Sequence, residues 1–525
     1  MKRVQFFLSA LLISFLAIGF YGCKDDDDPK PDGGNNSEDN IVMESSYKGL
    51  AGFEGFDEAS KTYTMTADKE YVLDGFVFVN YGQTLKIEAG TVIKGKPGDG
   101  SNASALIVAR GGRIEASGTA DKPIIMTGIA DDLNGSVPRS ANQLWGGLII
   151  LGNASNNANN GDGYFGSNIE GIPTSEGRGA WGHGDTQFFG AFGNPTDENG
   201  NTLTSGEEVT FEKNDAHDAG FIKYVSIRHG GSKIGANNEI NGLTLGAVGN
   251  ATDIDYVEIW SNQDDGIEWF GGTANIKHAV VSWQGDDALD YDEGFNGTTQ
   301  FGLVWINDNS LQSNDPRGGE HDGGNKPDDA QPFSSPSFAN ITYIGDIDDE
   351  GKGGLGNLIL FRDNAGGSYY RSVFANFQKG IAVEDLEDDA AEDSYKRFLA
   401  GQEGGSNNAP LHLNNNLFYN VGGADLSDPK LLFTIPDYGD NTPANPAHVD
   451  KLQNAFGAIN HIGDPKFGTG AMKVVPAADG AAVENLGDDL PAAFENVNYK
   501  GAFAPGQEPW IKGWTVAYEV LSSDN

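Results

Sequence analysis

Residues 262–272 read Asn-Gln-Asp-Asp-Gly-Ile-Glu-Trp-Phe-Gly-Gly, and residues 284–294 read Gln-Gly-Asp-Asp-Ala-Leu-Asp-Tyr-Asp-Glu-Gly. Aligned without a gap, the two stretches repeat one pattern after 22 residues. The repeat pairs Asp264 with Asp286, Asp265 with Asp287, Ile267 with Leu289 and Trp269 with Tyr291. A unit this short, rich in strand-forming residues and closed by Asp, Asn and Gly turns, cannot bury its apolar side alone and must stack on copies of itself. The two stretches therefore predict successive coils of a parallel β-helix.

The same register extends to both sides of this centre. Runs that begin at Phe221, Asp253 and Asn275 align with one another at spacings of 32 and 22 residues. Within the longer spacing, Gly242 opens a run 24 residues before Gly266, so the extra residues form an excursion at a corner and add no coil. Similar short runs of β-branched and aromatic residues recur along the chain, and helical periodicity is nearly absent. We therefore expect an all-β solenoid with long loop insertions.

The chain has 525 residues, of which 74 are Gly and 21 are Pro. This length would suit two or three ordinary domains, but a solenoid grows by adding coils, so we expect one domain over residues 41–525. Residues 41–70 are expected to cap the first coil, because an open end must be protected from edge pairing. Insertions are expected at about residues 153–218, 307–336 and 384–408, the last with the best helix candidate, and the segment with Trp510 and Trp514 is expected to close the far end.

The first 40 residues have the pattern of a targeting segment and a tether. Basic residues precede an apolar run from Phe6 to Phe20, which is too short and too close to the terminus for a membrane span. Cys23, the only cysteine, resembles the lipidated residue of a bacterial lipoprotein, which implies that residues 1–22 are a signal peptide. The acidic run after it resembles the export signal of Bacteroidota surface lipoproteins, and residues 23–40 continue as a Pro, Gly and Asn-rich linker.

Acidic residues outnumber basic residues by 76 to 34, which gives a formal net charge of −42. Such a charge repels nucleic acid phosphates, so we expect no nucleic acid partner. It attracts divalent cations, or it simply keeps a secreted protein soluble, and the sequence leaves both explanations open.

Further motifs mark the fold outside the central repeat. They include Glu88-Ala-Gly-Thr-Val-Ile, Leu106-Ile-Val-Ala-Arg-Gly-Gly-Arg-Ile-Glu-Ala, Lys122-Pro-Ile-Ile-Met-Thr, Trp145-Gly-Gly-Leu-Ile-Ile-Leu-Gly and Tyr499-Lys-Gly-Ala-Phe. In these motifs the chain resembles the large right-handed parallel β-helix surface lipoproteins of Bacteroidota, which are similar in architecture to the pectate-lyase superfamily. The resemblance covers nearly the whole mature chain and implies the fold, but no catalytic signature is tied to these motifs.

Stacked coils bring carboxylates of the central repeat together, because neighbouring strands lie about 4.8 Å apart. If Ile267 and Trp269 point inward, Glu268 points outward and Asp290 lies beside it one coil later. Carboxylates this close repel one another unless a cation, a retained proton or backbone N–H groups compensate them. The candidate metal ligands are Asp264, Asp265, Glu268, Asp286, Asp287 and Asp290.

Three interpretations of these acids stay open. Asp side chains in tight turns commonly bond the backbone, so the arrangement can be purely structural. It can also hold Ca²⁺, which prefers several carboxylate and carbonyl oxygens. The third interpretation is an acid and base pair that acts on a glycosidic bond. A metal-assisted lyase would also need a base such as Arg228, Arg317 or Arg362, and none of these can be placed against the acids, so we assign no catalytic residue.

The first insertion is rich in Gly and Asn and carries aromatic and polar side chains. Long loops in compact folds are commonly functional, and aromatic rings with nearby polar groups suit the C–H faces and hydroxyls of sugars. The candidate ligand-binding residues are Trp181, His183, Phe188 and Phe189, with Asp292 and Glu293 extending the acidic strip. The alternative is a loop that only packs on the flank of the solenoid.

These features predict a lipoprotein of the outer membrane that faces the cell exterior and binds an extracellular ligand. A glycan is the leading hypothesis for that ligand, with Ca²⁺ as a candidate cofactor and an outer-membrane transporter as a candidate partner. The alternatives are a carbohydrate-active enzyme, either polysaccharide lyase or glycoside hydrolase, and a structural or adhesive surface protein.

Overall fold

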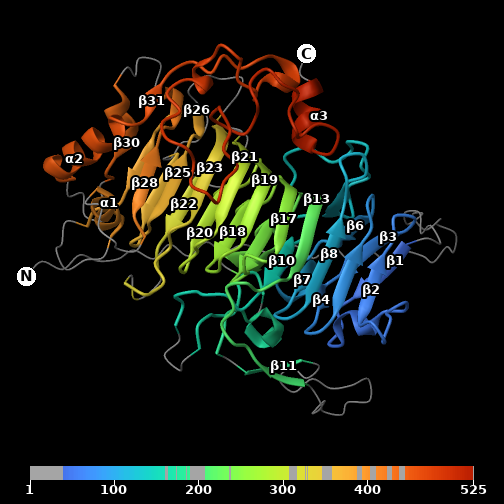
Figure 1. Cartoon of the computed structure of the whole chain (residues 1–525). Coiled ribbons are helices and arrows are strands. Elements are labelled where there is room, and N and C mark those ends of the chain that lie inside the picture. Colours follow the sequence, from blue (N-terminus) through green and yellow to red (C-terminus); the bar gives the residue numbers. More distant parts are fainter. Residues whose placement is uncertain are drawn as a thin grey trace, which may run out of the picture. The chain divides into compact units, whose positions relative to one another are not determined.

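Two long parallel sheets run through the computed structural model of this chain, and most coils contribute strands to both (Figure 1). The larger, 17-stranded sheet contains β1 (Asn40–Glu44), β2 (Thr62–Met65), β3 (Glu70–Asp74), β5 (Thr84–Ile87), β6 (Val92–Gly95), β8 (Arg113–Ser117), β9 (Ile124–Gly128), β13 (Gly220–Arg228), β17 (Asp253–Trp260), β19 (Asn275–Ser282), β21 (Thr298–Trp305), β23 (Ser337–Ile344), β25 (Gly367–Tyr370), β26 (Val373–Phe377), β28 (Leu411–Asn414), β29 (Leu417–Val421) and β31 (His461–Ile462). The ten-stranded sheet contains β4 (Phe76–Val79), β7 (Ala105–Val108), β10 (Leu148–Leu151), β16 (Leu243–Gly246), β18 (Ile267–Phe270), β20 (Leu289–Asp292), β22 (Gly319–Asp322), β24 (Ile359–Arg362), β27 (Ile381–Val383) and β30 (Phe433–Thr434).

Besides six short 3-10 helices, two short hairpins and three α-helices complete the elements among the described residues. The hairpins are β11 (Thr186–Phe189) with β12 (Glu207–Thr210) and β14 (Lys233–Gly235) with β15 (Asn238–Glu239), and the helices are α1 (Ser394–Gln402), α2 (Pro446–Gly457) and α3 (Val516–Ser523). The structure describes residues 40–159, 164–172, 174–184, 186–189, 207–235, 238–306, 316–324, 327, 329–345, 358–386, 393–402, 409–422, 428–436 and 444–523, of which 174–176, 186–189 and 207–208 are described by their backbone alone. The predicted signal peptide, Cys23 and the tether up to residue 39 lie outside these ranges.

Pairing in the central coils confirms the predicted register. In the ten-stranded sheet, Leu243 pairs with Ile267 and Ile267 pairs with Leu289, at the predicted offsets of 24 and 22 residues. In the 17-stranded sheet, Ile254 lies between its counterparts in β13 and β19. Residues Asn40–Asn525 form one compact unit around this stack of coils. The parallel β-helix predicted from the 22-residue repeat is therefore confirmed.

On the side of the ten-stranded sheet, the interior of the solenoid is filled by every second residue of each strand. Ile267, Trp269, Leu289 and Tyr291 are at most 1% exposed and belong to one core that follows the coils. Rings stack from coil to coil, with 4.1 Å between the ring centres of Tyr291 and His321. Burial in this apolar column lowers the pKa of His321 to about 3 and keeps its ring neutral.

The outer face of the ten-stranded sheet is also apolar over its first coils, and the first insertion covers it. Outward residues of β4, β7 and β10 pack against insertion residues in a second core, which includes Phe78, Ile107, Ile149, Leu151, Ile169, Ile172, Trp181 and Phe211. The Arg178 guanidinium lies over the Phe78 ring, 3.7 Å from its centre, and fixes the insertion at one more point. This part of the loop therefore packs on the flank of the solenoid.

Residues 307–336 are predicted to be an insertion, but part of this segment is a strand of the ten-stranded sheet. Gly319–Asp322 form β22, which pairs with β20 through Tyr291 and His321 and with β24 on its other side. The strand belongs in the sheet because His321 fills the interior while its neighbours Glu320 and Asp322 point outward. The excursion before this strand makes the offset 30 residues, which conceals the coil from a search at 22.

The C-terminal segment does not close the far end as predicted. It returns along the outer face of the 17-stranded sheet, and α3 lies beside the middle of the sheet, near β13 (Figure 1). The segment follows this path because outward residues of the sheet, such as Val280 and Leu303, are apolar and are removed from water by it. They share a core with Val475 and Phe503. We call residues 464–523 the return strap.

The other predicted segments have mixed structure. Residues 41–70 contain β1 and β2, which pair with β3 and β5 and so extend the sheet at its first coils. The predicted helix in the third insertion is present as α1. In the described part of the chain, every helix is too short or too polar to cross a lipid bilayer.

Candidate metal centre

Outward-pointing acids occupy the middle of the ten-stranded sheet, just beyond the edge of the apolar second core. Glu268 of β18 pairs in register with Asp290 of β20, and Phe270 pairs with Asp292. The next coil places Glu320 and Asp322 of β22 at the following positions. The alternation of a strand thus turns the repeated acid of the sequence into a row of carboxylates outside the core.

The turn that precedes these strands forms a second column. Asn241, Asp265, Asp287 and Arg317 occupy equivalent positions in four successive coils. Each of the first two side chains accepts a hydrogen bond from the backbone N–H of the next coil, from Asp265 to Asn241 Oδ1 at 3.2 Å and from Asp287 to Asp265 Oδ1 at 2.8 Å. Asp265 therefore has a structural role in the turn and still presents a second carboxylate oxygen.

The two columns meet in a compact group of carboxylates. Among the described residues, Asp264, Asp265 and Asp286 can each place one oxygen within 4.8 Å of the others, and so can Asp265, Glu268 and Asp290. Asp265 belongs to both groups. We call these five residues the acidic cluster. One predicted ligand, Asp287, belongs to neither group because its carboxylate pairs with the guanidinium of Arg317 at 3.2 Å.

Segments outside the repeat add further acids to the cluster. Glu170 of the first insertion and Glu239 of β15 both act on Asp264, where burial and then Glu170 raise the pKa to about 8. Burial and the neighbouring Glu239 raise the pKa of Glu170 itself to about 7. The pKa values of Asp265, Glu268 and Asp290 lie well above the usual range because of burial first and neighbouring carboxylates second. These acids therefore retain protons unless a cation offsets their charge.

Two arginines border the cluster on the side of the later coils. Arg317 pairs with Asp287 and Glu320, and Arg362 pairs with Glu320 at 2.6 Å and with Asp322 at 2.7 Å. Hydrogen bonding to Asp322 and the acids around it raise the pKa of Arg362 despite its burial. An arginine held this way keeps its proton, so it is a poor base for a metal-assisted lyase. The third predicted candidate, Arg228, lies on β13 of the other sheet and bonds Ser226.

The donor set fits a hard divalent cation. The cluster offers carboxylate oxygens from two turns and two strands, and Ca²⁺ prefers several such ligands in flexible geometry. Asp290 Oδ1 is buried and has no hydrogen-bond partner among the described residues, which leaves an acceptor in need of a cation or a proton. The side chain of Asn241 donates to Glu268 Oε2 and orients that carboxylate toward the cluster.

The predicted ligand-binding residues do not form one exposed surface. Trp181 is only 1% exposed and packs in the second core, so its prediction as a binding platform is wrong. His183 is half-buried and stacks on Phe165 with 5.0 Å between ring centres. The side chains of Phe188 and Phe189 on β11 lie outside the described parts. Asp292 and Glu293 continue the acidic strip, and burial with Glu170 nearby raises the pKa of Glu293 to about 7.

Comparison with models of protein families identifies the family of this chain. A family model described as a pectate-lyase-like β-helix domain matches residues 57–172 and 178–419, which is more than half of the chain. The chain belongs to this family. The match identifies the solenoid as a right-handed parallel β-helix. It is also compatible with a carbohydrate-related function. No curated protein matches the sequence.

In this pectate-lyase-like β-helix protein, the acidic cluster lies inside the matched region and the return strap lies outside it. Sequence reasoning missed Glu170, Glu239 and Glu320 as neighbours of the cluster. For Glu320 a signal was present, since Arg317-Gly-Gly-Glu-His-Asp repeats the acid-aromatic-acid order of Asp287-Ala-Leu-Asp-Tyr-Asp. Glu170 has no such signal, because its segment has no periodic relation to the coils.

Proposed function

We propose that this protein is a lipid-anchored surface protein of the bacterial outer membrane that binds an extracellular glycan with the help of Ca²⁺ in the acidic cluster. The observation that carries the cation proposal is the pair of carboxylate groups that share Asp265. Membership of the β-helix family supports a carbohydrate-related role. The anchor and the outward orientation rest on Cys23 and the acidic residues that follow it.

A binding role accounts for the site better than catalysis does. A glycosidase of the retaining type places a sugar between two carboxyl groups about 5–5.5 Å apart, one of them protonated and the other ionised. Here burial raises the pKa of Glu268 and Asp290 alike, so no acid is set apart from a base. Both arginines near the strip are engaged by carboxylates. A bound cation would use the carboxylates of both Glu268 and Asp290.

The cation proposal is tested by titrating metal-free protein with Tb³⁺ as a luminescent substitute for Ca²⁺. Trp269 is adjacent to Glu268 in β18 and provides the sensitising ring. We expect a saturable signal that Ca²⁺ displaces and that Asp265→Asn with Asp290→Asn abolishes, while Asp121→Asn at an exposed turn leaves it unchanged. A signal of equal strength in the double variant rejects the cluster as the cation site.

The glycan proposal is tested on an array of polysaccharides with Ca²⁺ or with EDTA. Retention without product supports binding, shortened or unsaturated products support a hydrolase or lyase, and the absence of both favours a structural or adhesive role. The anchor is tested by metabolic labelling with a fatty-acid analogue. We expect label in the wild type and none in Cys23→Ser.

A further inference from the structure

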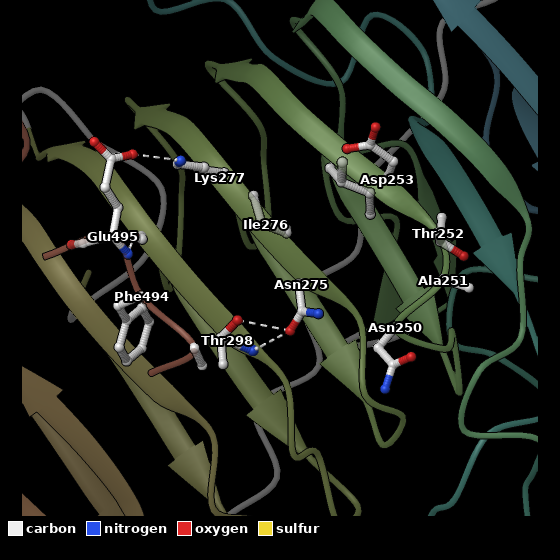
Figure 2. A pocket seen from close by; sticks show the side chains of 13 residues that line it. Asn250, Ala251, Thr252, Asp253, Asn275, Ile276, Lys277, Thr298, Phe494 and Glu495 are labelled. Atoms are coloured by element: carbon white, nitrogen blue, oxygen red, sulfur yellow. Dashed lines mark hydrogen bonds and ion pairs between the residues drawn. The ribbon is translucent and has the colours of Figure 1, made fainter. Parts of the chain in front are cut away.

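A cavity of about 370 Å³ lies on the outer face of the 17-stranded sheet, away from the ten-stranded sheet that carries the acidic cluster. Its floor is the start of β17, β19 and β21, and residues 493–495 of the return strap form one wall (Figure 2). The cavity opens to solvent, and its volume lies within the range of small-molecule sites, roughly 300–1,000 Å³. It shares no lining residue with the acidic cluster.

Hydrogen bonds fix the polar groups of this cavity. The Asn275 side-chain oxygen accepts from Thr298 N at 3.0 Å and from Thr298 Oγ1 at 2.8 Å. The amide nitrogen of Asn275 is therefore turned away from Thr298, toward the side of Asn250 (Figure 2). Gln300 donates to the carbonyl of Glu495 at 2.7 Å and accepts from its N–H at 2.9 Å, which ties the strap to the sheet. Such an arrangement is preorganised for a ligand.

The charges that line the cavity are neutralised in pairs. Lys277 pairs with Glu495 at 2.9 Å (Figure 2). Asp253 pairs with Lys223 at 2.7 Å. A phosphate or a metal ion would have to compete with these pairs, so the cavity suits an uncharged ligand. Amides, hydroxyls and paired carboxylates together offer donors and acceptors, and Phe494, which is 8% exposed, adds a small apolar edge.

We propose that this cavity binds an uncharged, hydroxyl-rich ligand, namely one or two units of a neutral saccharide. The fixed amides and hydroxyls match the hydroxyl groups of a sugar ring, and the apolar edge at Phe494 can meet its C–H groups. One wall comes from the return strap, outside the region that matches the family model, while the floor comes from strands inside that region. Binding here needs no cation.

The experiment measures binding of neutral sugars in EDTA by saturation-transfer NMR. The probes are glucose, galactose, mannose, N-acetylglucosamine, maltose and cellobiose. Ala251→Trp fills the cavity from an exposed position on its rim, and Ala59→Trp makes the same change at an exposed turn elsewhere. Asn275→Asp keeps the acceptor for Thr298 and removes the amide donors. We expect at least one probe to bind the wild type and Ala59→Trp equally, and to bind Ala251→Trp and Asn275→Asp at least about tenfold more weakly.

Thermal melts of the four proteins in EDTA verify that each variant is folded, and Tb³⁺ titration of the same samples reports the acidic cluster separately. The proposal is overturned if none of the probes binds the wild type, if Ala251→Trp binds as well as Ala59→Trp, or if the sugar signal appears only with Ca²⁺. Each of these results leaves the cation titration interpretable, because the two sites share no residue.

Discussion

Asp290→Asn should reverse its effect on stability when Ca²⁺ is added. In the acidic cluster, oxygens of Asp265, Glu268 and Asp290 lie within 4.8 Å of one another. Two like charges at that separation repel by about 3.5 kcal/mol at an effective dielectric constant of 20. The substitution keeps the shape of the side chain and removes the charge from two such pairs. Because a retained proton already relieves part of this repulsion, we expect the metal-free variant to be about 1–3 kcal/mol more stable than the wild type at pH 8.

The pH dependence of this gain has a defined sign. Burial and neighbouring carboxylates raise the pKa of Asp290, so above the carboxyl pKa of the unfolded chain the native state binds more protons than the unfolded state. The stability of metal-free wild type therefore falls as the pH rises, and the variant lacks this loss. The advantage of Asp290→Asn should shrink as the pH falls toward 4, where this carboxyl is about half protonated in the unfolded chain as well. Saturating Ca²⁺ at about 100 times its Kd adds about 2.7 kcal/mol to the wild type and less to the variant.

Chemical denaturation at about pH 4, 6 and 8, with EDTA or with Ca²⁺, measures all of these differences. Asp121→Asn is the matched control, because its exposed side chain lies outside the cluster. If Asp290→Asn is less stable than the wild type in EDTA at every pH, its carboxylate acts as a structural acceptor and the electrostatic reasoning is refuted. The same holds if Ca²⁺ stabilises both proteins equally.

Three further substitutions test how the return strap and the first insertion pack on the solenoid. Glu258→Ala removes a buried carboxylate that accepts from the N–H groups of Val516 and Ala517 at 3.0 Å each, and denaturant midpoints should show a loss of about 2–4 kcal/mol. Trp181→Ala should cost about 3–5 kcal/mol by the same measurement, because it empties part of the second core. Burial lowers the pKa of Lys500 to about 7, so the unfolded chain binds the extra proton and wild-type stability falls as the pH drops below about 10. Lys500→Met should thus gain about 1–3 kcal/mol at pH 6 and little at pH 10, measured by urea denaturation at both pH values.

The coil register was predictable because one constraint repeats. Ile267 and Leu289 must fill the same interior, so a fixed spacing between apolar residues carries the pairing of whole strands. The same spacing places Asp264, Asp265 and Asp286 close together, so the convergence of these three acids followed from the repeat alone. The 22-residue spacing does not predict β22, because an excursion before this strand changes the spacing. Glu320 is therefore predicted in a loop although it lies in a strand.

The outer cover of the solenoid was harder to predict. Continuous apolar runs, such as those that contain Val280 in β19 and Leu303 in β21, indicate strands that are buried on both faces, but they do not say which segment covers the outside. The return strap and the first insertion meet the sheets through contacts between residues far apart in the chain, as between Glu258 and Val516. No period in the sequence links such partners, and the position of Glu170 over the acidic cluster depends on the same kind of contact.

Asn241, Asp265, Asp287 and Arg317 occupy equivalent turn positions, here called the turn column. They show what the turn requires and which charges exceed that requirement. Asn241 accepts the backbone N–H of the next coil with a neutral amide oxygen, so the turn requires an acceptor and does not require an anion. Asp265 also accepts the backbone N–H of the next coil, but its carboxylate adds a negative charge beside Glu268 and repels that side chain when both are ionised. In the coil after Asp287 the position is taken by Arg317, which ends the column with the opposite charge. The acids of the turn column are therefore Asp265, which belongs to the acidic cluster, and Asp287, which pairs with Arg317. Turn formation requires neither charge, and the proposed cation would offset the charge on Asp265.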